Sequence, residues 1–487
     1  MDSDSPTPPA PALRRFPTRV PGLDTVLGGG FLAGDTYLIT GAPGTGKTTL
    51  GNQLAFAHAA AGGTVLFATL LTESHDRMLA HLQDVTFFDR ALVGDRIHYI
   101  SLMASIQEGD FAGTLQLLVE MLRDYGASLL VIDGAGLARM FATSTVEYLR
   151  FVHGLNTRAS AFGCTTVLLT GHREEETVAT HVDGVIQLSN VAISTVSVRD
   201  ARWLRVAKLR GSDYLSGQHR FAIGAGGVTV YPRLEAAHAE LMPTWYEPEH
   251  RLALGIPGLD AMLGGGLQDG SSTLVVGTPG AGKTVLGLHF LAEGARHGER
   301  GLFAGFHETP PALAATADQL GMALGPHLES GLVRTMWRPP LELAPDEWAW
   351  QLLAAVEEHR PRRLVIDGYS DLIPLFAIPE RRAFFPPALV NRLRDLRVTA
   401  LIVLEIDAFA GPALTLPVQN VSASMDNGIL LRSVEVQSSL SRMVSVLKQR
   451  QTGFDPTIRE FTIGPGGMVV GDPFDASALL TGVADPI

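Results

Sequence analysis

The sequence contains, at residues 41–48, the stretch Gly41-Ala42-Pro43-Gly44-Thr45-Gly46-Lys47-Thr48. An apolar run at residues 36–40 precedes it and predicts a buried strand, and a segment with apolar residues at helical spacing follows it. Strand, glycine-rich turn and helix form the context in which this spacing makes a phosphate-binding loop. The glycines let successive backbone N–H groups turn toward phosphate oxygens, and the helix N-terminus adds partial positive charge. The stretch therefore predicts a nucleotide-binding site.

A second stretch, Gly277-Thr278-Pro279-Gly280-Ala281-Gly282-Lys283-Thr284, repeats the pattern 236 residues later. In each loop the lysine is expected to reach the β- and γ-phosphates of ATP, and the threonine hydroxyl after it is expected to ligate Mg²⁺. The predicted nucleotide-binding residues are Gly41, Gly44, Thr45, Gly46, Lys47, Thr48 and Thr49 in the first loop and Gly277, Gly280, Ala281, Gly282, Lys283, Thr284 and Val285 in the second.

Other landmarks recur at nearly the same offset, which indicates a tandem duplication of a whole domain. Residues 21–24, Pro-Gly-Leu-Asp, recur at 257–260, and the strand-like run 129–134 is matched by 363–368. We expect a tail over residues 1–17, domain 1 over 18–245, domain 2 over 246–474 and a short tail over 475–487. In each unit, apolar runs alternate with helical segments, which predicts an α/β fold with a mainly parallel sheet flanked by helices. Period-two alternation over 193–207 and 434–447 predicts an antiparallel hairpin at the sheet edge.

Two pairs of carboxylates are candidate catalytic or metal-binding groups. Asp133 and Asp367 each end an apolar run, and ligands collect at the carboxyl ends of parallel strands, so each is expected to help hold Mg²⁺. Glu73 and Glu308 follow the next strand candidate, 26 and 25 residues after the loop lysine. A glutamate there is placed to orient the attacking water as a general base.

Lysine is used in a way that points to two further site residues. The 487-residue chain holds four lysines, Lys47, Lys208, Lys283 and Lys448, and all its other basic residues are arginine. The four occupy two equivalent pairs of positions. A compact ammonium aimed at phosphate is not replaced by a planar guanidinium. Lys208 and Lys448 are therefore also predicted to face phosphate.

The overall composition restricts the class of protein. With 46% hydrophobic and 18% charged residues the chain can form globular cores, and a net charge of −12 disfavours a protein that coats nucleic acid. The single cysteine, Cys164, lies in an apolar run and is interpreted as a buried thiol. No apolar run is long enough to span a bilayer, and the first residues do not resemble a signal peptide. We expect a cytoplasmic protein without membrane contact.

With these residues assembled, the chain resembles the KaiC family of RecA-type P-loop ATPases in its double-domain form, from about Val20 to Asp472. The specific marks are Pro-Gly-Leu-Asp followed by Gly-Gly-Gly ahead of each loop, and the Lys-x-Arg pairs late in each unit. The resemblance implies tandem RecA-like domains in two-tiered hexameric rings that act as a signalling ATPase. It also implies that ATP at each subunit interface is met in trans by a neighbour's catalytic pair, Lys208 and Arg210 or Lys448 and Arg450.

The sequence departs from this family at two places. The clock member carries two adjacent glutamates at the catalytic position, whereas this chain has Thr72-Glu73 and His307-Glu308. The Ser-Thr pair that the clock member autophosphorylates is matched by Ser422 and Ala423. Ser422 is therefore the candidate phosphoacceptor for a weak serine autokinase activity.

Two alternatives of a different class stay open. One is a DNA-acting RecA-type recombinase or helicase, whose pore loops carry basic residues. Here residues 171–183 hold one arginine against four acidic residues, and 405–426 hold no lysine or arginine. This loop charge opposes phosphate binding, so we do not expect nucleic acid as a partner. The other is a scaffold in which ATP joins subunits without being hydrolysed.

Overall fold

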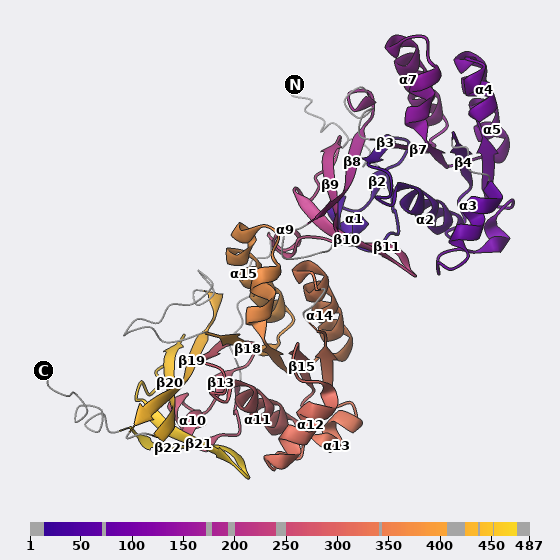
Figure 1. Ribbon diagram of the computed structural model, residues 1–487. Helices are drawn as coiled ribbons and strands as arrows, with labels where there is room; N and C mark the ends of the chain where they lie inside the picture. Colours follow the sequence, from indigo (N-terminus) through magenta and orange to yellow (C-terminus); the bar gives the residue numbers. More distant parts are fainter. Residues whose placement is uncertain are drawn as a thin grey trace, which may run out of the picture. The chain divides into compact units, whose positions relative to one another are not determined.

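In the computed structural model of the chain, the described residues are 14–70, 75–171, 178–192, 200–239, 250–339, 343–406, 424–436, 439–450 and 452–474. The chain divides into two compact units, residues 1–237 and 238–487 (Figure 1). The expected boundary at 245–246 falls within 240–249, which lie outside the described residues. Each unit is described by itself.

Domain 1 is built on one sheet, with the order β11-β10-β9-β8-β3-β7-β6-β4-β5 among the described strands. The strands from β8 to β5 in this order are parallel, and β8, β9, β10 and β11 follow one another antiparallel. The bounds are β3 (Thr36–Gly41), β4 (Val65–Thr69), β5 (Ile97–Ser101), β6 (Leu129–Asp133), β7 (Thr165–Thr170), β8 (Gly184–Ala192), β9 (Asp200–Leu209), β10 (Gln218–Gly224) and β11 (Gly227–Tyr231).

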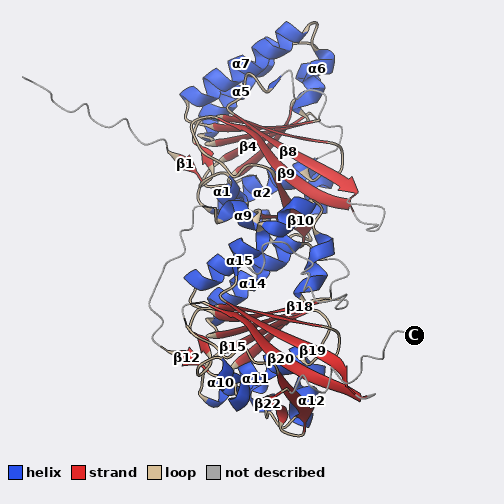
Figure 2. Cartoon of the chain, turned by 90° about the vertical axis from the view of Figure 1, so that its left-hand side faces the viewer, coloured by secondary structure: helices blue, strands red, loops and turns tan. Residues whose placement is uncertain are grey.

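Helices cover both faces of this sheet, as Figure 2 shows. On one face α1 and α2 pack in a core with Leu50, Leu54 and Phe56, and on the other α5 and α7 pack through Leu118, Leu122 and Leu155. The other described elements of domain 1 are the helices and the two-residue strands β1 and β2. Their bounds are β1 (Arg15–Phe16), α1 (Leu23–Val26), β2 (Phe31–Leu32), α2 (Lys47–Ala60), α3 (His75–Leu82), η1 (Arg90–Leu92), α4 (Met103–Gln107), α5 (Phe111–Tyr125), η2 (Ala135–Leu137), α6 (Ala138–Phe141), α7 (Thr145–Ala161) and α9 (Leu234–Ala237).

Domain 2 repeats this architecture, with the sheet order β16-β15-β17-β18-β14-β19-β20-β21-β22. Its strands are β14 (Ser272–Gly277), β15 (Gly301–Gly305), β16 (Val333–Trp337), β17 (Arg363–Asp367), β18 (Thr399–Glu405), β19 (Asn427–Val436), β20 (Ser439–Gln449), β21 (Arg459–Gly464) and β22 (Gly467–Pro473). The other described elements are β12 (Arg251–Leu252), α10 (Pro257–Met262), β13 (Leu267–Gln268), α11 (Lys283–Arg296), α12 (Pro310–Gln319), α13 (Gly325–Glu329), α14 (Pro345–His359), η5 (Tyr369–Leu375), η6 (Pro379–Ala383) and α15 (Phe385–Asp395).

The predicted fold, two mainly parallel sheets flanked by helices and ending in an antiparallel hairpin, is confirmed. The hairpin is longer than the alternation indicated, because its first strand already begins at Gly184 in domain 1 and Asn427 in domain 2. These strands pair in parallel with β3 and β14 and are largely buried there, so their first residues read as apolar runs.

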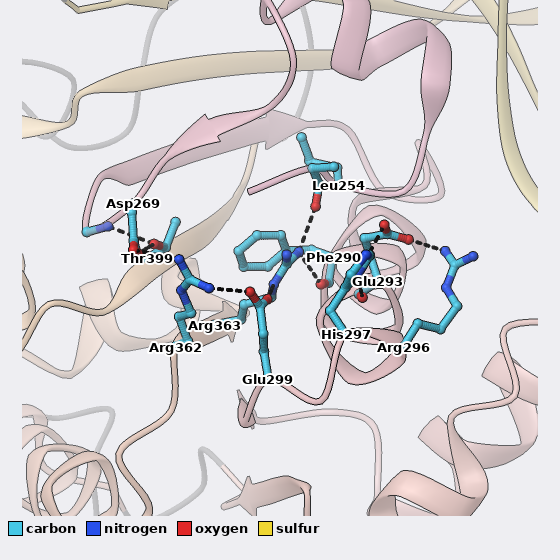
Figure 3. Close-up of polar contacts among 12 residues, drawn as sticks. Leu254, Asp269, Phe290, Glu293, Arg296, His297, Glu299, Arg362, Arg363 and Thr399 are labelled. Carbon is cyan, nitrogen blue, oxygen red and sulfur yellow. Dashed lines mark hydrogen bonds and ion pairs between the residues drawn. The ribbon is translucent and has the colours of Figure 1, made fainter. Parts of the chain in front are cut away.

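In both domains a polar contact fastens the helix after the phosphate loop to the strand that ends in aspartate, but its chemistry differs. In domain 1, His58 near the end of α2 bonds through Nε2 to the hydroxyl of Ser128, which directly precedes β6, at 2.7 Å. In domain 2 the guanidinium of Arg363, the first residue of β17, is 3% exposed and donates to the carbonyl oxygen of Phe290 in α11 at 2.9 Å. Figure 3 shows this guanidinium between the ring of Phe290 and the carboxylate of Glu299.

Glu299 is the centre of the domain 2 network. Its carboxylate accepts from Arg363 Nε at 2.6 Å and from Arg362 at 2.5 Å, while Arg362 also reaches Asp269 at 2.9 Å (Figure 3). Through these charge-assisted bonds to two arginines, Glu299 links the start of β17 to the segment that follows α11.

Candidate functional site

Both glycine-rich stretches form loops between a central strand and a helix. Gly44 and Gly46 have φ of 79° and 99°, and Gly280 and Gly282 have 72° and 96°, a region that favours glycine. A Cβ on Gly46 would lie 2.4 Å from Ile223, and one on Gly282 would lie 2.7 Å from Ile463. The glycines are thus required both by the turn and by the close approach of the antiparallel strands.

In each domain the loop threonine is bonded to the aspartate that ends the strand two places from the loop strand in the sheet. The Thr48 hydroxyl donates to Asp133 Oδ2 at 2.7 Å, and the Thr284 hydroxyl donates to Asp367 Oδ2 at 2.6 Å. The two aspartates are 3% and 8% exposed. Burial raises the pKa of Asp367, and the hydrogen bond from Thr284 opposes that rise. A hydroxyl and a carboxylate that converge in this way offer hard oxygen ligands, the kind that Mg²⁺ prefers.

The loop lysines are turned back onto their own loops. Lys47 Nζ donates to the carbonyl oxygens of Gly41 at 2.8 Å and Ala42 at 2.9 Å. Lys283 Nζ donates to those of Gly277 at 3.0 Å and Thr278 at 2.7 Å. Burial lowers the pKa of Lys47, and the charge of Asp133 opposes that shift. Both ammonium groups therefore lie at the mouth of a cavity with carbonyl oxygens as partners, and a phosphate could take over their hydrogen bonds.

A cavity opens at each loop, of about 580 Å³ in domain 1 and about 570 Å³ in domain 2. Most of the predicted nucleotide-binding residues line the two cavities: Gly41, Gly44, Gly46, Lys47, Thr48 and Thr49 in one, and Gly280, Gly282, Lys283, Thr284 and Val285 in the other. Gly277, which ends β14, is not among the residues that line the domain 2 cavity. The predicted metal ligands Asp133 and Asp367 and the predicted general base Glu308 also line these cavities. Thr45 and Ala281 do not line them, because their side chains are fully buried and their N–H groups bond within the loops.

The structure brings Glu308 to the domain 2 cavity, half-buried beside Asp367. Its neighbour His307 bonds through Nε2 to Asp371 Oδ2 at 3.0 Å on the cavity wall. Glu73, the equivalent of Glu308 in domain 1, lies outside the described residues, and so does Ser422.

The late Lys-x-Arg pairs lie away from the phosphate loop of their own domain. Lys208 is paired with Val185 of β8, whereas the loop begins at the level of Leu188, about 10 Å farther along the strand. Its ammonium donates to the carbonyl oxygens of Ala179 and Val182 at 2.7 and 2.6 Å. Arg210 Nη1 lies 3.7 Å from Asp183.

Domain 2 repeats this arrangement. Lys448 donates to the carbonyl oxygen of Met425 at 2.8 Å, and Arg450 lies 3.9 Å from Asp426. Burial, followed by the adjacent arginine, lowers the pKa of both Lys208 and Lys448. Neither pair meets its own cavity in the described structure.

Three residues of the domain 2 site were not predicted from the sequence. Glu405 ends β18 and lies 3.1 Å from Lys283, and Ser370 and Asp371 follow Asp367 in η5 and line the same cavity. The sequence did contain a signal for each of them. Glu405 is a charged residue at the end of an apolar run, and Ser370 and Asp371 lie a few residues after the predicted metal ligand Asp367, both positions at which ligands collect in parallel sheets.

No helix within the described ranges combines the length and the apolar character needed to cross a bilayer. Comparison with known proteins agrees with the duplicated architecture. The family described as "ATPase: KaiC" matches residues 16–235 and again 252–474.

The circadian clock oscillator protein KaiC of Picosynechococcus sp. is 26% identical over 95% of this chain and 90% of its own length. The circadian clock oscillator protein KaiC 1 of Synechocystis sp. is 27% identical, over 97% and 92%. The circadian clock protein KaiC2 of the same organism is 25% identical, over 94% and 81%. Since the family matches nearly the whole chain as two repeats, this protein belongs to the KaiC family of ATPases.

Proposed function

We propose that each domain binds ATP with Mg²⁺ and hydrolyses it to ADP and phosphate. The observation that carries this proposal is the bond between the loop threonine and the strand-end aspartate, which occurs in both domains below a loop of the same backbone shape. The arrangement is kept in both repeats although much of the surrounding sequence has diverged, which indicates a chemical requirement and not a chance contact.

The chain's own residues have distinct tasks in this reaction. Lys47 and Lys283 leave the loop carbonyls and bind the β- and γ-phosphates, while Gly44, Gly46 and their equivalents direct backbone N–H groups to the same oxygens. Thr48 with Asp133, and Thr284 with Asp367, hold Mg²⁺, which would neutralise charge that develops on the phosphates.

Hydrolysis also needs a group that orients the attacking water. Glu308 lies on the wall of the domain 2 cavity, and we assign this task to it and, by the repeat, to Glu73. The two sites then carry one such carboxylate each.

We further propose that the chain assembles into a homo-oligomer, a hexameric ring, with ATP between subunits. The distance of Lys208 from its own phosphate loop supports this arrangement, because an ammonium about 10 Å along the strand from that loop could meet the phosphates bound to a neighbouring subunit. Arg210, Lys448 and Arg450 have the same expected role, and charges supplied in trans stabilise the transition state of phosphoryl transfer.

Phosphate release from the purified chain with ATP and Mg²⁺ tests the hydrolytic function. Glu73→Gln and Glu308→Gln are each expected to remove part of the release, and the double variant is expected to remove it. Glu358→Gln, which alters an exposed carboxylate paired with Arg334, is the control. ATP retained by an oligomer that releases no phosphate would contradict hydrolysis and favour the scaffold.

Intact-mass analysis of the same sample tests serine autophosphorylation. A gain of about 80 Da, one phosphoryl group, that Ser422→Ala abolishes would assign the activity to Ser422. An unchanged mass after incubation would exclude it under those conditions.

A further inference from the structure

The two phosphate loops differ in the charge that faces their lysines. In domain 2, Lys283 Nζ forms an ion pair with Glu405 Oε2 at 3.1 Å, in addition to its two bonds to loop carbonyls. In domain 1 the described contacts of Lys47 Nζ are to carbonyl oxygens, and no ion pair is found for it among the described residues.

The strand register explains this difference. Glu405 is the last residue of β18 and lies opposite Gly277, the last residue of β14 before the loop. In domain 1 the corresponding strands pair Thr40 with Thr170, so the position of Glu405 is held by Gly171. A glycine there brings no carboxylate to the loop.

The backbone of Glu405 is fixed, while its carboxylate can move. The N–H of Glu405 donates to the Ser370 hydroxyl at 3.2 Å, next to the segment that follows Asp367. The side chain of Glu405 is 47% exposed, whereas that of Lys283 is 8% exposed. The carboxylate can therefore turn into water, where hydration replaces its ion pair, whereas the buried ammonium needs an anionic or carbonyl partner in its place.

We propose that Glu405 is an internal counter-ion that competes with the nucleotide phosphates for Lys283 and so lowers the nucleotide affinity of domain 2. This inference rests on the proposed function, because it assigns a regulator to the same ATP site. A nucleotide must break the ion pair to engage Lys283, and its phosphates then lie close to the displaced carboxylate. The broken ion pair and the repulsion between the carboxylate and the phosphates both disfavour the bound state. In domain 1 the equivalent residue is Gly171, which has no side chain and produces neither effect.

Nucleotide binding to the full-length chain tests this competition. In a Lys47→Ala background, domain 2 is the site that remains, and equilibrium binding of radiolabelled ATP with Mg²⁺ measures its affinity. Glu405→Gln keeps the shape and removes the charge, and it is expected to tighten binding about fivefold, the size of one ion pair with a half-exposed partner. Glu358→Gln in the same background is the matched control and is expected to leave the affinity unchanged.

The reciprocal variant uses the other repeat. Gly171→Glu in a Lys283→Ala background introduces a carboxylate at the equivalent register of domain 1, and it is expected to weaken ATP binding there by a similar factor. Glu405→Ala provides a second removal of the charge with a different side chain.

The outcomes separate the two proposals. Unchanged or weaker binding in both Glu405 variants would overturn the counter-ion while leaving ATP binding by domain 2 intact. No binding to domain 2 with or without the substitution would instead overturn the proposed function of that domain, and the counter-ion with it. Binding that appears only after the substitution would be its strongest support.

Discussion

The Glu299 network gives a stability prediction whose size follows from the structure. Arg363 is 3% exposed, and Glu299→Ala would leave its guanidinium with the carbonyl oxygens of Ala253 and Phe290 as partners. Removal of one partner from a buried ion pair costs about 3–5 kcal/mol, and we expect the low end, about 3 kcal/mol, because those two bonds remain. For a domain of this size such a loss lowers the melting temperature by about 6–12 °C.

Calorimetry of the full-length chain measures this effect. The transition of domain 2 is identified as the one that ATP raises in a Lys47→Ala background, and Glu299→Ala is expected to lower it while domain 1 is unaffected. Glu358→Gln, whose carboxylate is 73% exposed, is expected to change it by less than about 0.5 kcal/mol. A shift below about 2 °C for Glu299→Ala would refute the reasoning.

A double variant distinguishes a buried charge from a simple loss of packing. Glu299→Leu with Arg363→Met replaces the pair by apolar side chains of similar size, which is often close to neutral. It is therefore expected to restore much of the stability that Glu299→Ala loses. A double variant that is less stable than the single variant would indicate that the hydrogen bonds of Arg363 to Ala253 and Phe290, and not the charge balance, dominate.

Three other predictions concern domain 1, studied in a Lys283→Ala background where activity is measured. Thr48→Val removes a hydroxyl and is expected to lower phosphate release about a hundredfold, while ATP binding measured in EDTA is retained. Lys208→Ala and Lys47→Ala chains are each expected to be inactive alone. If the site is shared between subunits, an equal mixture should recover about a quarter of the activity, because about a quarter of the interfaces then combine both intact lysines. No recovery would exclude a shared site. Burial lowers the pKa of His58 to about 4 from 6.5, so the unfolded chain binds the proton first. The contribution of His58 to the stability of domain 1 should be complete above about pH 6.5 and fall by about 2 kcal/mol by pH 5 in thermal melts, and His58→Gln should remove that part of the pH dependence.

The central strands and both phosphate loops could be predicted because each leaves a local pattern in the sequence. The runs 36–40 and 129–134 correspond to β3 and β6, and the duplication shows each of these patterns a second time. The start of the hairpin was missed because its first strand is buried by the loop strand and does not alternate there. Glu73 and Ser422 lie outside the described residues, and their roles stay predictions.

The position of Glu405 at a strand end could be seen in the sequence, but its contact with Lys283 could not, for a physical reason. Its contact with Lys283 depends on the register of two parallel strands whose residues are 122 positions apart in the chain. Composition and spacing describe neighbours along the chain and do not give the pairing of distant strands. Lys208 is a similar case. The rarity of lysine marked it as a site residue, but its distance from the phosphate loop depends on strand pairing and could be seen only in the folded domain.

The two domains show which parts of the site tolerate change. The threonine–aspartate bond is kept in both domains, whereas the helix is bonded to the strand through His58 and Ser128 in domain 1 and through Arg363 and the carbonyl oxygen of Phe290 in domain 2. The residues that bond the helix to the start of the aspartate strand, away from the phosphate loop, can thus differ as long as the helix and the strand keep their relative position. A substitution beside the loop has a different consequence, because the carboxylate of Glu405 at the end of β18 changes the charge that a phosphate meets. Division of labour between the two domains is therefore expected to arise from the residues around the loops and not from the loops.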